Sequence, residues 1–274
     1  MPEQSAHPSL DLKAIGAHPE AHRAIEQLVT KISRSLAPHL VGMYFDGSIA
    51  LGDFDPARSD IDLVVITDDR LSDSATAELG ALHETLARSS PTWGEEIEVF
   101  YVSERDLDQH AVENRSVHRY VERGTGGLLR TRPLGLGWLV HLRILSQHGI
   151  TISGPDIRDL VVPVPDDALR HFVRLGATNR LHLYSNDPTL LARPGARAFA
   201  VLTACRMLHT FRTGSVVPKM EAARSALQFM DPPLANVIHA AMGWRKDHQD
   251  LAVTTEETVA LLRFVRDDCA SGKS

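Results

Sequence analysis

The most informative segment of the sequence reads Gly47-Ser48-Ile49-Ala50-Leu51-Gly52-Asp53-Phe54-Asp55-Pro56-Ala57-Arg58-Ser59-Asp60-Ile61-Asp62. Apolar runs typical of strands lie at residues 40–45 and 61–66. Because side chains alternate along a strand, Asp60 and Asp62 point to the same face. Two carboxylates side by side in an apolar strand repel each other, and a divalent cation removes that cost. The segment therefore predicts a site for Mg²⁺, which favours oxygen ligands and substrate phosphates. A surface loop with solvated acids is the alternative, but such a loop does not need carboxylates within a β-branched run.

The start of this segment predicts a phosphate-binding turn. Gly47 has no Cβ, so the backbone there can approach phosphate groups closely. The Ser48 hydroxyl and the neighbouring N–H groups can then bind phosphate oxygens at a helix start. Ser59 can donate to a phosphate oxygen or to Asp62, or it is an ordinary turn residue. Asp46 precedes this turn, and its negative charge would be unfavourable beside bound phosphate groups. We assign it no role.

The order of a strand, Gly47-Ser48, a spacer, and Asp60-Ile61-Asp62 on a second strand resembles the active site of the DNA polymerase β-like nucleotidyltransferase superfamily. The resemblance implies Mg²⁺-dependent transfer of a nucleotidyl group and a third carboxylate on the next strand. That strand is residues 95–102, where alternation puts Glu96 and Glu98 on one face. Glu98 lies deeper in the apolar run, so we predict it to be the general base and a further metal ligand. A solvent-facing strand acid is the alternative.

Composition excludes several classes of protein. The chain has 274 residues, enough for two domains, and 43% of them are hydrophobic. The net charge of −6 argues against a dedicated nucleic-acid binder. No apolar run is long enough to span a membrane, and residues 1–7 lack the features of a signal peptide and predict a frayed tail. The two cysteines, of which Cys205 is expected to be buried, and the fourteen scattered histidines predict neither a disulfide framework nor a zinc site. These features predict a cytoplasmic protein.

The residue pattern changes near residue 163, where strand-like apolar runs end and helical patterns follow. We therefore predict an α+β fold, in which residues 1–162 form a nucleotidyltransferase domain with a mixed sheet flanked by helices, and residues 163–274 form an α-helical bundle. The segment Gly124-Thr125-Gly126-Gly127 is expected to be a flexible turn. We expect strands at about 40–45, 61–66, 96–102 and 150–153, and helices at about 20–37, 73–89, 134–148, 166–185, 196–212, 218–230, 232–245 and 255–269.

With its C-terminal half included, the chain resembles the streptomycin/spectinomycin adenylyltransferases. The resemblance rests on Ile152-Ser153-Gly154-Pro155 at the junction of the halves, and on residues 201–206 followed by 213–219. It implies that Arg206 and Lys219 contact ATP, that Trp244 is a nucleotide-touching aromatic, and that the second domain closes over the nucleotide. Two cations facing a triphosphate are physically favourable. The alternatives are helix-surface cations and a core aromatic.

The sequence departs from that family at the acceptor side. Ala196 stands where the family carries an acidic drug contact, and Arg197 adds positive charge. The substrate-stacking tryptophan of the family has no clear counterpart, and Tyr120 is the nearest aromatic. Because aminoglycosides are polycations, these changes disfavour them as acceptors. Adenylyl transfer is therefore predicted more firmly than the acceptor.

The sequence predicts an enzyme that moves AMP from ATP to a hydroxyl of a small molecule, with Mg²⁺, and releases pyrophosphate. The acceptor is expected to be an antibiotic of the aminoglycoside type or another hydroxyl compound, and neither nucleic acid nor a membrane is an expected partner. One alternative is an antitoxin-like nucleotidyltransferase that modifies a protein hydroxyl, against which the long helical domain argues. The other is a non-catalytic nucleotide-binding protein, which would not need Asp60, Asp62 and Glu98 together.

Overall fold

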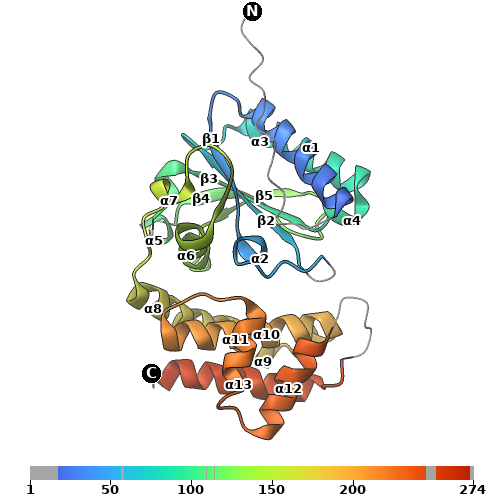
Figure 1. Cartoon of the computed structure of the whole chain (residues 1–274), viewed down its shortest axis with the longest axis vertical. Helices are drawn as coiled ribbons and strands as arrows, with labels where there is room; N and C mark the ends of the chain where they lie inside the picture. Colours follow the sequence, from blue (N-terminus) through green and yellow to red (C-terminus); the bar gives the residue numbers. More distant parts are fainter. Residues whose placement is uncertain (1–17, 57–58, 109, 114, 245–250, 272–274) are drawn as a thin grey trace, which may run out of the picture. The chain divides into compact units, whose positions relative to one another are not determined.

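The computed structural model describes residues 18–56, 59–108, 110–113, 115–244 and 251–271, and Figure 1 shows the course of the chain. The chain divides into two compact units. The first comprises Met1–Gly135 and Ile144–Val162, and the second comprises Leu136–Arg143 and Pro163–Ser274. Residues 136–143 thus group with the helical unit, although the sequence assigns them to the first domain. The tail predicted for residues 1–7 lies outside the described residues.

The first unit is built on a mixed six-stranded sheet with the order β5-β4-β3-β2-β1-β6. Strands β2 and β3 pair in parallel, and every other neighbouring pair is antiparallel. The sheet with its flanking helices confirms the predicted α+β class. The strands are β1 (Leu40–Phe45), β2 (Ile61–Thr67), β3 (Ile97–Ser103), β4 (Val117–Val121), β5 (Leu129–Pro133) and β6 (Ile150–Ser153).

Helices α1 (Pro19–Ser35) and α3 (Asp73–Ser89) belong to the core of this unit, and Figure 1 shows them beside each other with α4 (Pro91–Gly94). The buried residues of α1 recur every three or four positions, which is the spacing of one helical face. The Ser72 hydroxyl accepts the Ala75 N–H at 3.2 Å and begins α3. The shorter elements are α2 (Gly47–Ala50), a 3₁₀ turn (Glu104–Asp106), α5 (His110–Glu113) and α7 (Ile157–Leu160); α6 (Trp138–His148) runs from the second unit into the first.

The two faces of the sheet differ in chemistry. Alternate residues of β2 and β3 pack into the core that contains α1 and α3, namely Ile61, Leu63, Val65, Ile97, Val99 and Tyr101. Because side chains alternate, Asp62 and Glu98 point to the opposite face. The hydrophobic packing of one face therefore fixes where the carboxylates of the other face lie.

Strands β4 and β5 form a hairpin that the sequence analysis missed. Strand β4 mixes apolar residues with His118 and Arg119, and four of the five residues of β5 are exposed, so neither gives the apolar run expected of a core strand. The predicted turn at 124–127 joins the two strands. Its glycines Gly124, Gly126 and Gly127 all have positive φ, and the Gly124 N–H donates to the Glu95 carbonyl at 2.9 Å. The turn is thereby held at the start of β3.

The second unit is helical, as expected. Helix α10 (Pro194–Thr213) packs against α8 (Asp166–Gly176), α11 (Lys219–Ala226), α12 (Pro232–Gly243) and α13 (Thr255–Ser271). Cys205 of α10 is buried, which confirms its predicted position, and burial raises the pKa of its thiol to about 12. Over the described residues, we find no helix with the length and apolar character needed to span a membrane. The remaining elements are a π-helical turn (Ala177–Leu181), α9 (His182–Asn186) and a 3₁₀ turn (Pro188–Leu191).

One buried cation ties three segments of the helical unit together. The Arg143 guanidinium donates to the carbonyls of Gly214 at 2.9 Å and Val164 at 2.6 Å, and to the Asp166 carboxylate at 2.6 Å. The Arg143 side chain is only 7% exposed. These bonds hold the middle of α6, the start of α8 with the segment before it, and the end of α10 together.

Replacement of Arg143 by Met should lower the free energy of unfolding by about 2–4 kcal/mol, because two buried carbonyls lose a charged donor. Chemical denaturation followed by circular dichroism measures this loss. Arg174→Met is the matched control, since Arg174 is an exposed residue of α8 whose side chain lies 3.2 Å from His171 Nδ1. A loss at Arg143 no larger than that at Arg174 would contradict the role given to Arg143.

Candidate active site

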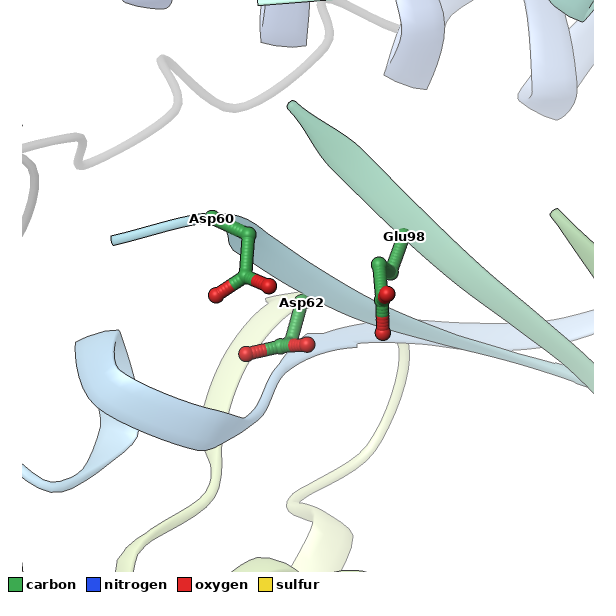
Figure 2. A group of neighbouring side chains, drawn as sticks. All are labelled: Asp60, Asp62 and Glu98. Atoms are coloured by element: carbon green, nitrogen blue, oxygen red, sulfur yellow. The ribbon is translucent and has the colours of Figure 1, made fainter. Parts of the chain in front are cut away.

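Asp60, Asp62 and Glu98 converge at the junction of β2 and β3, as Figure 2 shows. Each offers a carboxylate oxygen, and these oxygens lie within 4.8 Å of one another. All three side chains are half-buried. The structure therefore brings together the three acids that the sequence singles out, in a group that could hold a metal ion.

The parallel pairing of β2 and β3 explains this convergence. Asp62 and Glu98 are direct partners in the register, and the Ile61 N–H donates to the Glu96 carbonyl at 2.9 Å, which extends the ladder toward Asp60. Residues at the same level of adjacent strands present their side chains side by side. Glu96, the alternative to Glu98, instead pairs with Arg123 at 3.0 Å. The role of Glu98 as a base stays a prediction.

The Gly47-Ser48 turn lies directly against Asp62. The Asp46 N–H donates to the Asp62 carbonyl at 3.0 Å, and Gly47 follows with φ +59° at the start of α2. A Cβ built on Gly47 would overlap the Asp62 carboxylate. Only glycine fits here on both counts, because the left-handed backbone and the close approach each penalise a side chain. Asp46 itself is fully buried at the N-cap position of α2.

Ser48 offers a donor to a ligand. Its Oγ is buried, and no hydrogen-bond partner for it is found within the described part of the chain. An unsatisfied buried hydroxyl is costly, so a ligand oxygen at this point would be favoured. Ser59 is different, because its Oγ accepts the Asp55 N–H at 3.0 Å and its own N–H donates to the Asp55 carbonyl at 2.7 Å. Ser59 thus closes a turn, and its contact with phosphate stays a prediction.

Tyr120 is a residue whose place at the site the sequence analysis did not identify. It lies on β4 opposite Phe100 of β3, and its ring is 4% exposed. Burial, the charge of Glu98 and a hydrogen bond to the Glu98 carboxylate raise the pKa of Tyr120, so the hydroxyl stays protonated and donates to Glu98. The Arg132 guanidinium covers the ring at 3.6 Å from its centre. Tyr120 therefore orients Glu98 and is too buried to serve as a stacking surface for an acceptor.

The acids fit a divalent cation of the Mg²⁺ type. The donor set consists of carboxylate oxygens alone, which suits a hard cation that keeps part of its shell for water and phosphate. Three half-buried carboxylates this close together repel one another, and a bound cation would relieve that repulsion. Asp60, Asp62 and Glu98 are the residues that would hold it.

The predicted nucleotide contacts of the second unit lie along one face of α10. The Lys219 ammonium sits 4.2 Å from the centre of the Phe199 ring. The Trp244 ring lies against Gly195, where an added Cβ would come within 3.0 Å of it. Gly195, Phe199 and Arg206 are four and seven residues apart, which places them on the same helical face. Their contact with a nucleotide stays a prediction.

The acceptor-side departures also lie on α10. Ala196 is in its first turn, one residue after Gly195. The neighbouring Arg197 donates through Nη1 to the carbonyls of Leu191 at 2.9 Å and Ala192 at 3.0 Å. Its guanidinium therefore caps the preceding 3₁₀ turn, and the positive charge that the sequence suggests for acceptor recognition is engaged within the fold.

The fold and the site define the class of protein. A mixed sheet with paired acids on adjacent strands, behind a glycine-serine turn, is the arrangement expected for nucleotidyl transfer. The family description "Nucleotidyltransferase domain" matches residues 25–117, which include the turn and all three acids. The chain is a nucleotidyltransferase, and hence an enzyme.

The second match narrows the family. The description "Aminoglycoside adenylyltransferase, C-terminal domain" matches residues 159–268, which include most of the helical unit. The chain is therefore an aminoglycoside adenylyltransferase-like nucleotidyltransferase, as its resemblance implies. No curated protein matches its sequence.

A solved structure shows the same fold. Spectinomycin adenyltransferase AAD(9) from Enterococcus faecialis, solved with ATP and spectinomycin, matches with a TM-score of 0.72 at 17% identity. The match covers 90% of this chain and 98% of that chain. The STING-associated CdnE c-di-GMP synthase from Capnocytophaga granulosa covers 94% of this chain and 84% of that chain at 13% identity, but its TM-score is only 0.27.

Gly47→Ala should disturb the acidic site in addition to straining the backbone at a positive φ. The new Cβ must displace the Asp62 carboxylate, so Mn²⁺ affinity should fall along with a stability loss of about 1–2 kcal/mol. Gly52→Ala is the control, because Gly52 has φ +69° but nothing within 4 Å of an added Cβ. Gly52→Ala should lose stability and keep Mn²⁺ affinity. Equal Mn²⁺ binding by both variants would contradict the close approach at Gly47.

Proposed function

We propose that the protein transfers AMP from ATP to a hydroxyl of a small molecule and releases pyrophosphate, with Mg²⁺ held by Asp60, Asp62 and Glu98. The observation that carries the proposal is the convergence of these three carboxylates within 4.8 Å beside the Gly47-Ser48 turn. Such a cluster suits phosphoryl-type chemistry, because it could hold a divalent cation that would stabilise charge on the reacting phosphate groups.

The residues of the first unit divide the work. The N–H groups of the Gly47-Ser48 turn and the buried Ser48 hydroxyl bind phosphate oxygens of ATP. Glu98 accepts the proton of the acceptor hydroxyl, and Tyr120 holds the Glu98 carboxylate in place for it. When bound, Mg²⁺ neutralises charge on the triphosphate and on the developing pyrophosphate. Ser59 supports the turn that leads into Asp60 and is available to a phosphate oxygen.

The helical unit, within the proposed domain 163–274, contributes nucleotide contacts. Lys219 and Arg206 offset triphosphate charge, and Trp244 contacts the nucleotide. Support comes from Arg206 on α10, from the contacts of Lys219 and Trp244 with Phe199 and Gly195 of the same helix, and from the match of this region to the adenylyltransferase C-terminal domain. The nucleotidyltransferase domain is proposed to span residues 1–162. Use of ATP as co-substrate agrees with a cytoplasmic enzyme.

The acceptor is proposed to be a hydroxyl-bearing small molecule, with aminoglycoside-type antibiotics as the first compounds to test. Spectinomycin is the reference compound, because AAD(9) was solved with it. Ala196 in place of an acid lowers the attraction of this site for polycations. Compounds with fewer charges therefore belong in the same screen.

A pyrophosphate-release screen across hydroxyl compounds, after calorimetry with ATP and Mg²⁺, tests the proposal. Release that requires both ATP and one small acceptor supports it. AMP attached to a protein in place of a small molecule would favour the antitoxin-like alternative. Tight Mg-ATP binding without release for any acceptor would favour a nucleotide-binding protein.

Glu98→Gln should lower turnover by roughly 10²–10⁴, because glutamine keeps the shape of the side chain but cannot take a proton. Mg-ATP affinity, measured by calorimetry, should stay near the wild-type value if Asp60 and Asp62 hold the metal. Glu95→Gln is the control. The Glu95 carboxylate, just before β3, accepts the Gly126 N–H and lies outside the triad. Collapse of Mg-ATP binding together with turnover would make Glu98 chiefly a metal ligand, and unchanged turnover would exclude it as the base.

Lys219→Ala should weaken ATP binding by about ten- to a hundredfold, because a charge-assisted contact contributes about 1.5–3 kcal/mol. Arg224→Ala on the same helix is the control, since Arg224 is exposed in the last turn of α11. Calorimetric titration with ATP and Mg²⁺ compares the two variants. Equal losses, or none at Lys219, would show that Lys219 is only a surface cation.

A further inference from the structure

Arg123, two residues beyond the end of β4, is bound to the acidic group at three points. Its Nη1 lies 3.5 Å from the Asp60 Oδ2, and its Nε lies 3.0 Å from the Glu96 Oε2. Its backbone N–H donates to the Glu98 Oε1 at 3.4 Å. No sequence pattern identifies this residue, and the functions given to Asp60 and Glu98 do not require it.

The two side-chain contacts of Arg123 differ in what a metal would do to them. Asp60 belongs to the acidic triad, so a cation bound there competes directly with the guanidinium for the same carboxylate. Glu96 lies outside the triad, so its contact with the Arg123 Nε can persist. When a metal binds, the guanidinium can therefore leave Asp60 and still keep its contact with Glu96.

The main-chain contact keeps Arg123 beside Glu98. Because the Arg123 N–H is bonded to Glu98, the side chain starts beside the carboxylate proposed to deprotonate the acceptor. The Arg123 side chain is 38% exposed, so it can reach a ligand as well as the protein. An acceptor that brings its hydroxyl to Glu98 must therefore come close to this cation.

We propose that Arg123 is an acceptor-selecting residue, which pairs with Asp60 while the metal is absent and meets the acceptor beside Glu98 once the metal is bound. This inference rests on the proposed function and deepens it by naming the acceptor class. The favoured acceptor carries a carbonyl, carboxylate or phosphate oxygen near its reacting hydroxyl, to which a guanidinium donates. An ammonium group at the same place is repelled.

The first test measures Mn²⁺ binding alone, with no nucleotide and no turnover. Arg123→Gln should bind Mn²⁺ about two- to fivefold more tightly than the wild type, because a partly exposed competing cation is removed. Arg123→Lys retains the charge and should stay near the wild-type affinity. Arg130→Gln is the charge-matched control, since Arg130 is an exposed residue of the neighbouring strand β5 that lies 3.9 Å from Glu122.

The second test measures acceptor binding without chemistry. Protein loaded with Mn²⁺ and a non-hydrolysable ATP analogue is titrated with spectinomycin, a hydroxyl compound with amino groups. Arg123→Gln should bind it about two- to fivefold more tightly than the wild type, and Arg130→Gln should not. Thermal unfolding of each variant shows that the comparison concerns folded protein.

The outcomes separate this inference from the proposed function. Mn²⁺ affinity that is unchanged or weaker in Arg123→Gln overturns the pairing with Asp60. Spectinomycin affinity that is unchanged, weaker or undetectable in Arg123→Gln overturns the selection of the acceptor. A wild-type enzyme that releases no pyrophosphate with any hydroxyl compound overturns the proposed function, and both binding tests can still be read.

Discussion

The mutual repulsion of Asp60, Asp62 and Glu98 is the constraint on which the rest of the site depends. Their oxygens lie within 4.8 Å of one another on half-buried side chains, an arrangement that a chain in water would not adopt by itself. What holds them there is the opposite face of the same strands, whose alternate residues pack with α1 and α3. Hydrophobic burial on one face of the sheet thus offsets an electrostatic cost on the other. A cation near the acids lowers that cost, and Arg123 provides one within the fold.

The Gly47 turn follows from the same constraint. The Asp46 N–H bonds to the Asp62 carbonyl, which brings the end of β1 against the start of β2. A Cβ at the next residue would overlap the Asp62 carboxylate, so the backbone reaches the acid only through glycine. The turn therefore places the N–H groups of a helix start beside the carboxylates. A ligand with both phosphate oxygens and a bound cation satisfies the two halves of this arrangement at once, which is the chemical reason a metal-bound triphosphate fits it.

The sequence predicts the structure correctly where a local pattern of apolar residues determines a strand. The apolar runs at 40–45 and 61–66 gave β1 and β2 to within a residue, and side-chain period alone aligned Asp60 with Asp62. Prediction failed at β4, where His118 and Arg119 interrupt the apolar residues, and at β5, an exposed edge strand with alternating charges, because neither has an apolar run to detect. Because the hairpin was not predicted, two residues near the site were missed as well: Tyr120 and Arg123 reach Glu98 through that hairpin. Such contacts join residues that are distant in the sequence and meet only through strand pairing, so one amino-acid sequence alone does not predict them.

On the role proposed for Arg123, the β4–β5 hairpin would let one scaffold change its acceptor while its chemistry is kept. Asp60, Asp62 and the Gly47 turn belong to the two central strands, where a substitution would disturb the metal site and the core together. Arg123 lies beyond the end of β4, with its side chain partly in solvent and its backbone bonded to Glu98. Replacing that side chain alters the charge beside the base while the main-chain bond to the base remains. On the role proposed for Arg123, acceptor preference varies at this position while the residues proposed to bind the nucleotide stay unchanged, and metal affinity changes only through the Asp60 contact.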